Sequence, residues 1–471
     1  MAATPPHRTP PSDVSTTSMF GQTLAIARNT FLEAIRQPIF FVLILVGGLA
    51  QVFNVLLSAY SLGFSDEGEV AADNKMLLDM GLATILLICL LLASFVATSV
   101  LSREIENKTA LTVIAKPVGR PMFILGKYVG ITAAILLAAV TLTAFFMLAM
   151  RHQVMSTARD HVNGPVVVFG GLAVLISVGV GLWGNFFYGW VFPSVATTLM
   201  APLSVIAWAL TLLIDENWAI TQAYSVVWRP NVLVACACVM MALFVITGIA
   251  LAASTRLGQV MTIVVCAGMF FGGLLSNHLL GKRAYDNTWV AKVAEVELPD
   301  PEVQSLAEPT ETATITLTSA VDVPLEPGRS VYFGPGANGI NIAVPKHPAW
   351  RGTDVNNGTQ LLDTNNGKAL LIRSYDPVTR KLVLVNAGGL HVNRPPMEGD
   401  YVFLTPTTYN IAPLAAWALI PNMQSYWVVD AITQNHPIPV RYVGIVALYT
   451  VLQVGAMVSL AMLLFQTRDV G

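Results

Sequence analysis

The sequence predicts a mainly α-helical, polytopic membrane bundle of about eight spans with a small β domain inserted into it. Of its 471 residues, 54% are hydrophobic and only 11% are charged, whereas soluble domains carry about 25% charged residues. Several uncharged runs reach the length of about 20 apolar residues that a membrane-spanning helix needs. Between residues 282 and 404 these runs stop, and short stretches that alternate apolar and polar residues replace them, which is the period of a β-strand.

The chain begins with a segment that precedes the first span. Residues 1–20 are rich in Pro, Ser and Thr, a composition typical of disorder. Residues 21–36 predict an amphipathic helix that lies in the membrane interface, although a plain extension of the first span is the alternative. The apolar face of this helix consists of Leu24, Ala27, Phe31 and Ile35.

Eight apolar runs are long enough to span a membrane. Seven lie within residues 38–281, and the eighth lies in 440–471 with a short tail. The runs are 38–62, 77–101, 126–150, 166–190, 195–214, 231–254, 259–281 and 441–465. Residues 162–214 form one charge-free stretch interrupted by Pro193, so this stretch predicts either two spans or one long kinked helix.

The distribution of Lys and Arg in the short loops predicts the orientation, because cytoplasmic loops carry the excess of positive charge. The most basic short loop lies between the second and third spans, and with an even number of spans both termini fall on its side. The chain is therefore expected to be a multi-pass protein of the cytoplasmic (inner) membrane with both termini in the cytoplasm. Arg151 and Arg159 are the exception, because their loop falls outside.

By this orientation, residues 282–404 form an extracytoplasmic β domain, a barrel or a sandwich. Four segments predict strands, and the third reads as a hairpin. They are 312–318 (TATITLT), 330–334 (SVYFG), 369–385 (ALLIRSYDPVTRKLVLV) and 400–404 (DYVFL). Residues 405–439 are apolar but rich in Pro and Asn, and we expect short re-entrant helices at the outer face.

The sequence predicts no catalytic, cofactor or metal site in this chain, and hence no enzyme. There is no G-x-x-x-x-G-K-[ST] phosphate loop, no H-E-x-x-H and no G-x-S-x-G. Cys236 and Cys238 form a C-x-C pair, but no second cluster completes a metal site. The net charge of −2 gives no basic face for nucleic acid. The spans hold almost no ionisable residue, which disfavours an ion-coupled carrier.

The basic loop, residues 101–130, reads LSREIENKTALTVIAKPVGRPMFILGKYVG. Its charged ends and apolar middle suit docking to a partner, and an ordinary basic loop fits its composition equally well. The segment resembles the cytoplasmic coupling region of ABC type-2 permeases, which reads R-E-x-E, Gly-Thr, [RK]-P-V-[SG]-R and G-K. Lys108 stands where Gly is usual. The matching residues are Arg103, Glu104, Glu106, Thr109, Lys116, Pro117, Val118, Arg120, Gly126 and Lys127.

The resemblance extends to residues 251–268, 419–432 and 460–471, in family order. It implies one permease half of an ABC exporter, paired with an identical or different second half in the lipid bilayer. It also implies a separate cytoplasmic ATPase subunit that binds the ATP and docks on residues 102–126, the coupling segment. The docking residues it implies are Arg103, Glu104, Glu106, Thr109, Lys116, Pro117, Arg120 and Lys127. The alternative is a non-transport scaffold or receptor whose β domain binds a partner.

Overall fold

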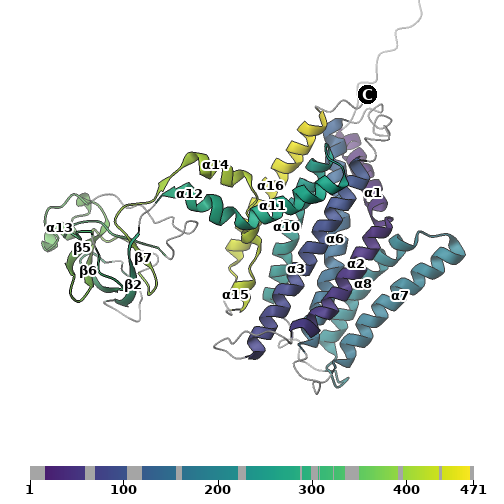
Figure 1. Cartoon of the computed structure of the whole chain (residues 1–471), viewed down its shortest axis with the longest axis horizontal. Helices are drawn as coiled ribbons and strands as arrows, with labels where there is room; N and C mark the ends of the chain where they lie inside the picture. The colour runs from purple at the N-terminus through teal and green to yellow at the C-terminus, as the bar shows by residue number, and fades with distance from the viewer. Residues whose placement is uncertain are drawn as a thin grey trace, which may run out of the picture. The chain divides into compact units, whose positions relative to one another are not determined.

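The structure is a computed structural model in two compact units, formed by Met1–Phe271 with Met423–Gly471 and by Gly272–Asn422 (Figure 1). It describes residues 16–58, 69–102, 119–154, 162–220, 230–286, 289–298, 306, 308–321, 323–334, 350–390, 396–433 and 438–466.

Eight helices in the described ranges are long and apolar enough to cross a membrane, which confirms the predicted count. One further helix, α1 (Thr16–Ile35), precedes them and covers most of the range predicted to be amphipathic. The eight are α2 (Pro38–Leu57), α3 (Glu69–Ala97) with its π-helical extension η2 (Thr98–Ser102), α6 (Arg120–His152), α7 (Gly164–Tyr188), α8 (Phe192–Leu213), α10 (Pro230–Ser254), α11 (Gln259–Ser276) and α16 (Val440–Gln466).

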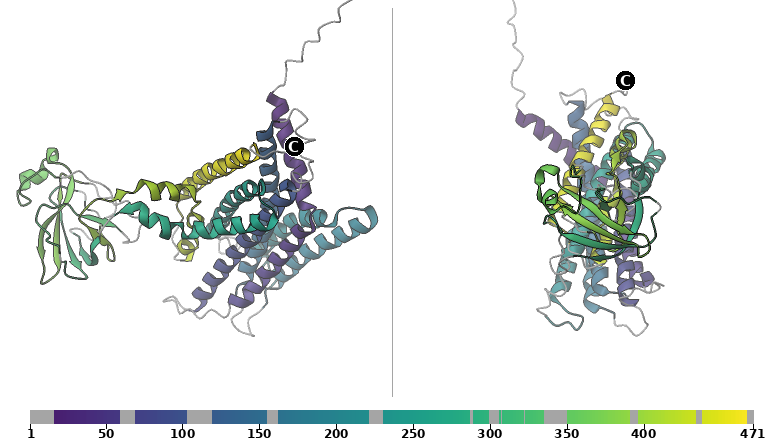
Figure 2. Two further views of the ribbon diagram at one scale, coloured as in Figure 1. Left: turned by 45° about the horizontal axis from the view of Figure 1, so that its top comes forward. Right: turned by 90° about the vertical axis from the view of Figure 1, so that its left-hand side faces the viewer.

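The charge-free stretch 162–214 forms two helices rather than one kinked helix. Gly189 ends α7 in the left-handed conformation (φ 65°), and its N–H bonds to the carbonyl of Gly184. Glycine adopts this conformation without the steric cost of a Cβ atom. Pro193 then stands in the first turn of α8, where its missing N–H costs nothing. The two helices pack against each other as an antiparallel hairpin (Figure 2).

The helices of the larger unit differ in how much of their surface is enclosed. In α3, α6 and α10, 67%, 61% and 67% of the apolar stretch is buried, whereas the value is 22% for α7 and α16. The first three helices therefore form the centre of this unit. The exposed sides of α7 and α16 are apolar, as expected for helices that face lipid tails.

The smaller unit contains an antiparallel sheet of six strands in the order β4-β7-β2-β3-β6-β5. The strands are β2 (Trp289–Glu297), β3 (Thr312–Leu317), β4 (Tyr332–Gly334), β5 (Ala369–Asp376), β6 (Lys381–Ala387) and β7 (Tyr401–Phe403). The sheet closes on itself, because Ser330, just before β4, bridges to Leu371 in β5. The N–H of Val331 bonds to the carbonyl of Leu370 at 2.9 Å beside this bridge. The predicted β domain is thus a closed barrel.

Alternation along the strands fills the barrel. In β3, Ala313, Ile315 and Leu317 are buried while the threonines between them are not, as the sequence pattern predicts. They join Val293 of β2 and Val402 of β7 in one apolar core. A short helix, α13 (Gly358–Leu362), covers a second apolar cluster on the outer side of β5 and β6.

The chain enters and leaves the barrel through a narrow neck. β1 (Tyr285–Asp286) pairs antiparallel with β8 (Thr408–Tyr409). On the entering side, α11 continues through the π-helical η3 (Asn277–Gly281) and α12 (Lys282–Ala284), and on the leaving side β8 is followed by α14 (Ile411–Leu419). Asn422 donates to the side-chain oxygen of Asn277 at 2.7 Å. The described part of the range 405–439 holds α14 and two further short helices, η5 (Met423–Tyr426) and α15 (Val429–Thr433).

Candidate functional site

The coupling segment falls largely outside the described residues. Residues 103–118 are not described, and six of the eight predicted docking residues lie there: Arg103, Glu104, Glu106, Thr109, Lys116 and Pro117. Arg120 and Lys127 are described, and both stand in the first turns of α6. The segment leaves the bundle at the end of η2 and returns at the start of α6. The candidate site therefore consists of the end of η2, the start of α6 and the helices that contact them.

Lys127 joins three of these elements. Its side chain is 2% exposed, and its Nζ lies 3.9 Å from Oε2 of Glu33 on α1. The same Nζ donates to the carbonyl of Val100 in η2 at 3.5 Å and lies 5.4 Å from the ring centre of Phe123. A buried ammonium is stable only when it is paired and hydrogen-bonded. Lys127 thus fixes α1 and η2 to α6 at the base of the coupling segment.

Two glycines of α6 bring α1 close to its backbone. A Cβ atom at Gly130 would lie 2.5 Å from the carbonyl oxygen of Ala27, and one at Gly126 would lie 2.8 Å from Ile26. Gly126 and Gly130 form a G-x-x-x-G pair, a spacing that lets membrane helices approach closely. The buried face of α1 is formed by Ala27, Thr30, Ala34 and Ile35.

This buried face differs from the apolar face predicted for α1. Ala27 and Ile35 belong to both, but Leu24 is 58% exposed and Phe31 is half-buried. Thr30 is buried in their place because it packs against Gly130. The position of α1 in the membrane interface stays a prediction.

Two arginines meet the last turn of α16. Arg120 donates from Nη1 to the carbonyl of Gln466 at 3.2 Å, and Arg256, after α10, donates from Nε to the carbonyl of Leu464 at 3.1 Å. The last carbonyls of a helix lack partners within the helix, and a cation there also complements the helix dipole. The rings of Phe123 and Phe465 stack beside them at 5.7 Å.

Together these contacts define what we call the basic end of the bundle: the start of α6 with Arg120 and Lys127, the facing part of α1, η2, Arg256 and the last turn of α16. Gln37, between α1 and α2, also bonds to Ser99 of η2. Glu33 and Gly130 were not predicted to belong to a site, and Gly126 was named only as a match to the G-K step of the family motif. The G-x-x-x-G spacing was the available signal, whereas nothing local in the sequence pairs Glu33 with Lys127.

The described residues offer no site for metal chemistry at this end or elsewhere: no group of three His, Cys, Asp or Glu residues is placed to hold an ion. All four cysteines are buried. The contacts at the basic end join α1, η2, α6 and α16 at the two points where the coupling segment leaves and re-enters the bundle.

A comparison with family models matches residues 24–184 to the ABC-2 family transporter protein. The match runs from α1 through most of α7 and includes η2, the coupling segment and Lys127. Comparisons with curated proteins and with solved structures gave no match. Members of this family are typically non-catalytic membrane subunits, and they generally pair with ATPase subunits. The chain is a multi-pass integral membrane protein that carries, over residues 24–184, an ABC-2 family transporter membrane domain.

Proposed function

We propose that this chain is the permease half of an ABC exporter and that a separate cytoplasmic ATPase subunit docks on the coupling segment. The buried contact of Lys127 with Glu33 and Val100 carries this proposal, because it ties both ends of the coupling segment to α1. A force on the segment then reaches α1, η2 and α6 together. The family match over the same residues supports this role.

The docking residues divide into two groups by their structural setting. Arg103, Glu104, Glu106, Thr109, Lys116 and Pro117 belong to the segment itself and would contact the ATPase. Lys127 is buried and Arg120 bonds to α16, so these two would transmit the motion rather than touch the partner. ATP binding closes the two ATPase subunits, and the segment passes that closure to the spans. Such a device needs two discrete arrangements of packed helices, which the ligand on the other chain biases.

The proposed orientation places the basic end in the cytoplasm and residues 282–404 outside. The charges of Arg120, Lys127 and Arg256 at one end of the bundle support it. Of the two arginines that are exceptions to this rule in the sequence, Arg151 lies 3.6 Å from the carboxylate of Asp215, and Arg159 lies outside the described residues. Arg151 is paired and adds little net positive charge to its end of the bundle.

The docking proposal is tested by co-purification with the candidate ATPase, chosen by its phosphate-loop motif and encoded beside this chain. We expect Glu104→Lys with Glu106→Lys to lose the ATPase while the permease still inserts into the membrane. The matched control is Glu295→Lys with Glu297→Lys, which makes the same charge change on the barrel. Loss of the ATPase from both variants, or from neither, would contradict the proposal. A chain that never binds or stimulates an ATPase would favour the scaffold function.

A further inference from the structure

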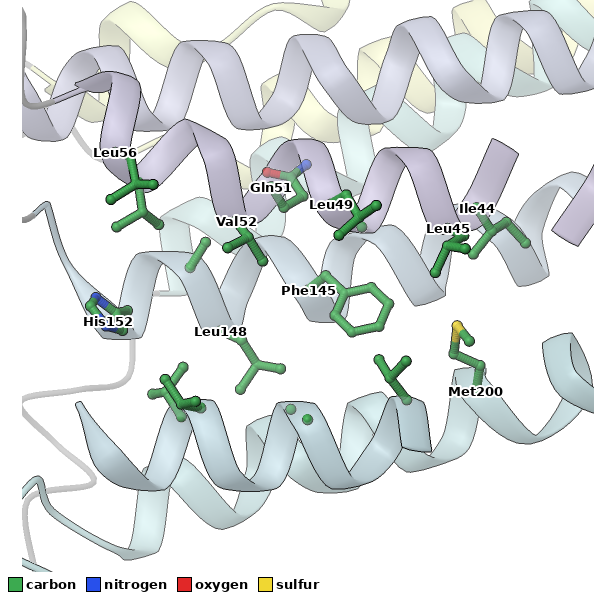
Figure 3. Close-up of a pocket in the computed structure, with 18 of the residues that line it drawn as sticks. Ile44, Leu45, Leu49, Gln51, Val52, Leu56, Phe145, Leu148, His152 and Met200 are labelled. Atoms are coloured by element: carbon green, nitrogen blue, oxygen red, sulfur yellow. The ribbon is translucent and has the colours of Figure 1, made fainter. Parts of the chain in front are cut away.

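The larger unit contains a cavity of about 420 Å³ between α2, α6, α7 and α8 (Figure 3). Its volume falls in the range of small-molecule sites. Among the described residues that line it, only Gln51 and His152 have polar side chains. The amide of Gln51 is engaged within the bundle, because its Nε2 donates to the carbonyl of Gly81 and its Oε1 accepts from Asn54. The cavity wall is therefore apolar along almost its whole length.

The cavity is long and has one polar end. It follows α2 from Ile44 to Leu56, which at a rise of 1.5 Å per residue is about 18 Å. That length is close to the depth of one leaflet, since the hydrocarbon core of a bilayer is about 30 Å thick. Figure 3 shows His152 at the Leu56 end and Met200 toward the Ile44 end. The polar group thus lies at the end of α6, where the helix leaves the apolar layer.

In a bilayer, the helices that form this cavity are surrounded by hydrocarbon. All four helices are candidate membrane spans, and several side chains of its rim are exposed, with 52% for Leu49, 62% for Val52 and 53% for Val167. Water does not fill an apolar cavity of this kind stably, because it finds no hydrogen-bond partners there. The molecules in contact with the rim are the acyl chains of membrane lipids.

We propose that this cavity holds one acyl chain of a membrane phospholipid from the leaflet in which α6 ends, with the phosphate headgroup beside His152. Arg151, the neighbouring residue, is held by Asp215 at 3.6 Å and by the carbonyl of Thr211 at 3.2 Å, which leaves His152 as the polar side chain among the described lining residues at this end. A polar group at the mouth and an apolar interior match the two parts of a phospholipid. The bound acyl chain fills the cavity. Without it, the side chains of α2 and of the α7–α8 hairpin that line the cavity would have no atoms to contact there.

Two glycines of α7 provide a matched pair of variants. Gly171 lines the cavity, and a Cβ atom there meets nothing within 4 Å, so Gly171→Phe would fill the cavity without displacing the backbone. Gly179 also has open space around its Cβ position but does not line the cavity. Gly179→Phe therefore adds the same side chain to the same helix and leaves the cavity open. His152→Glu is the third variant and places a carboxylate beside the phosphate.

The full chain is purified in mild detergent from membranes that contain a phosphatidylcholine with a photoreactive group in the middle of one acyl chain. Retained phospholipid is counted by native mass spectrometry, and photolabelled peptides are mapped. We expect one phospholipid per chain in the wild type and in Gly179→Phe, with label on residues 44–56 and 166–174. Gly171→Phe should lose both signals, and His152→Glu should weaken retention by about fivefold, because a carboxylate about 4 Å from the phosphate repels it by about 1 kcal/mol in water.

Three outcomes would overturn the proposal. The first is equal lipid retention and labelling in Gly171→Phe and the wild type. The second is detergent as the only retained molecule in the wild type. The third is cross-linking of residues 44–56 to another copy of the chain, which would make this surface a protein interface. If Gly171→Phe does not fold, Val174→Trp at the same wall is measured in its place, with the same expected loss.

Discussion

For Lys127, the sequence motif predicted the position on the third span but not the partners of the side chain. The sequence identified it through the G-K step that opens the third span, and therefore as part of the docking surface. The structure gives it a buried position with Glu33 and Val100 as partners. The residue type and its place on α6 were predictable from the local sequence. The pairing with Glu33 was not, because it depends on how two helices far apart in the chain pack.

The two members of this ion pair should differ in their effect on stability. Glu33 is 38% exposed and Lys127 is 2% exposed. Glu33→Ala removes the carboxylate beside the buried ammonium of Lys127, and the loss of one partner of a buried ion pair typically costs about 3 kcal/mol or more. Lys127→Met leaves a carboxylate that water still reaches, so we expect a loss of only about 1 kcal/mol. Thermal unfolding of the purified chain in detergent measures both.

The double variant Glu33→Ala with Lys127→Met serves as the control for this pair. It should be more stable than Glu33→Ala alone, since it removes the buried charge together with its partner. Equal losses for the two single variants would show that the contact is not the asymmetric pair described above.

Gly130 should be sensitive to any side chain. A Cβ atom there would lie 2.5 Å from the carbonyl oxygen of Ala27 and 2.6 Å from the Cβ of Thr30. Gly130→Val should therefore displace α1 and lower the free energy of unfolding by about 1–3 kcal/mol, the usual cost of overpacking. Gly179→Val, where a Cβ meets nothing within 4 Å, is the control. Limited proteolysis of α1 should speed up in the first variant alone.

At the scale of elements, the helices were more predictable than the sheet. The signals for a membrane helix, an apolar run with Pro or Gly at its ends, lie within the sequence of the helix itself. Most predicted spans therefore agree with the observed helices to within a few residues. The strand at 312–318 was predicted from its alternation and the two strands at 369–385 were predicted as a hairpin, but β2 was missed. Its buried positions, Ala291 and Val293, are small and are followed by Glu295 and Glu297. The strand order and the closure at Ser330 depend on pairings between distant segments, which a local pattern does not encode.

The strand order predicts which fragment folds by itself. β7 pairs with both β4 and β2, so a fragment that ends at Asp400 lacks a central strand of the barrel. We expect residues 285–409 to give a β-rich circular-dichroism spectrum and a cooperative melt. Residues 285–400 should give neither, because removal of β7 opens the sheet and exposes its core. Cooperative melting of the shorter fragment would show that the closed order is not needed for folding.

At the scale of the whole molecule, the membrane orientation is the main prediction. Single cysteines at Thr359 and Val378 are suitable probes, because both positions are exposed on the barrel and Val378 is 87% exposed. In a background without native cysteines, both should react with an impermeant maleimide in intact cells. Arg28→Cys, exposed on α1, should react only after lysis. The reverse pattern would invert the topology and place the coupling segment outside.

The neck of the barrel has an evolutionary consequence. Because Tyr285 pairs with Tyr409 and Asp286 with Thr408, the whole barrel occupies the position of a hairpin turn between α12 and α14. A gene segment that encodes such a module can be gained, lost or exchanged in a single recombination event, since the helices on either side keep their continuity. Homologues with the same helices and a different module, or a two-residue turn, at this point are the expected products. The same junction is a natural place to graft a reporter domain.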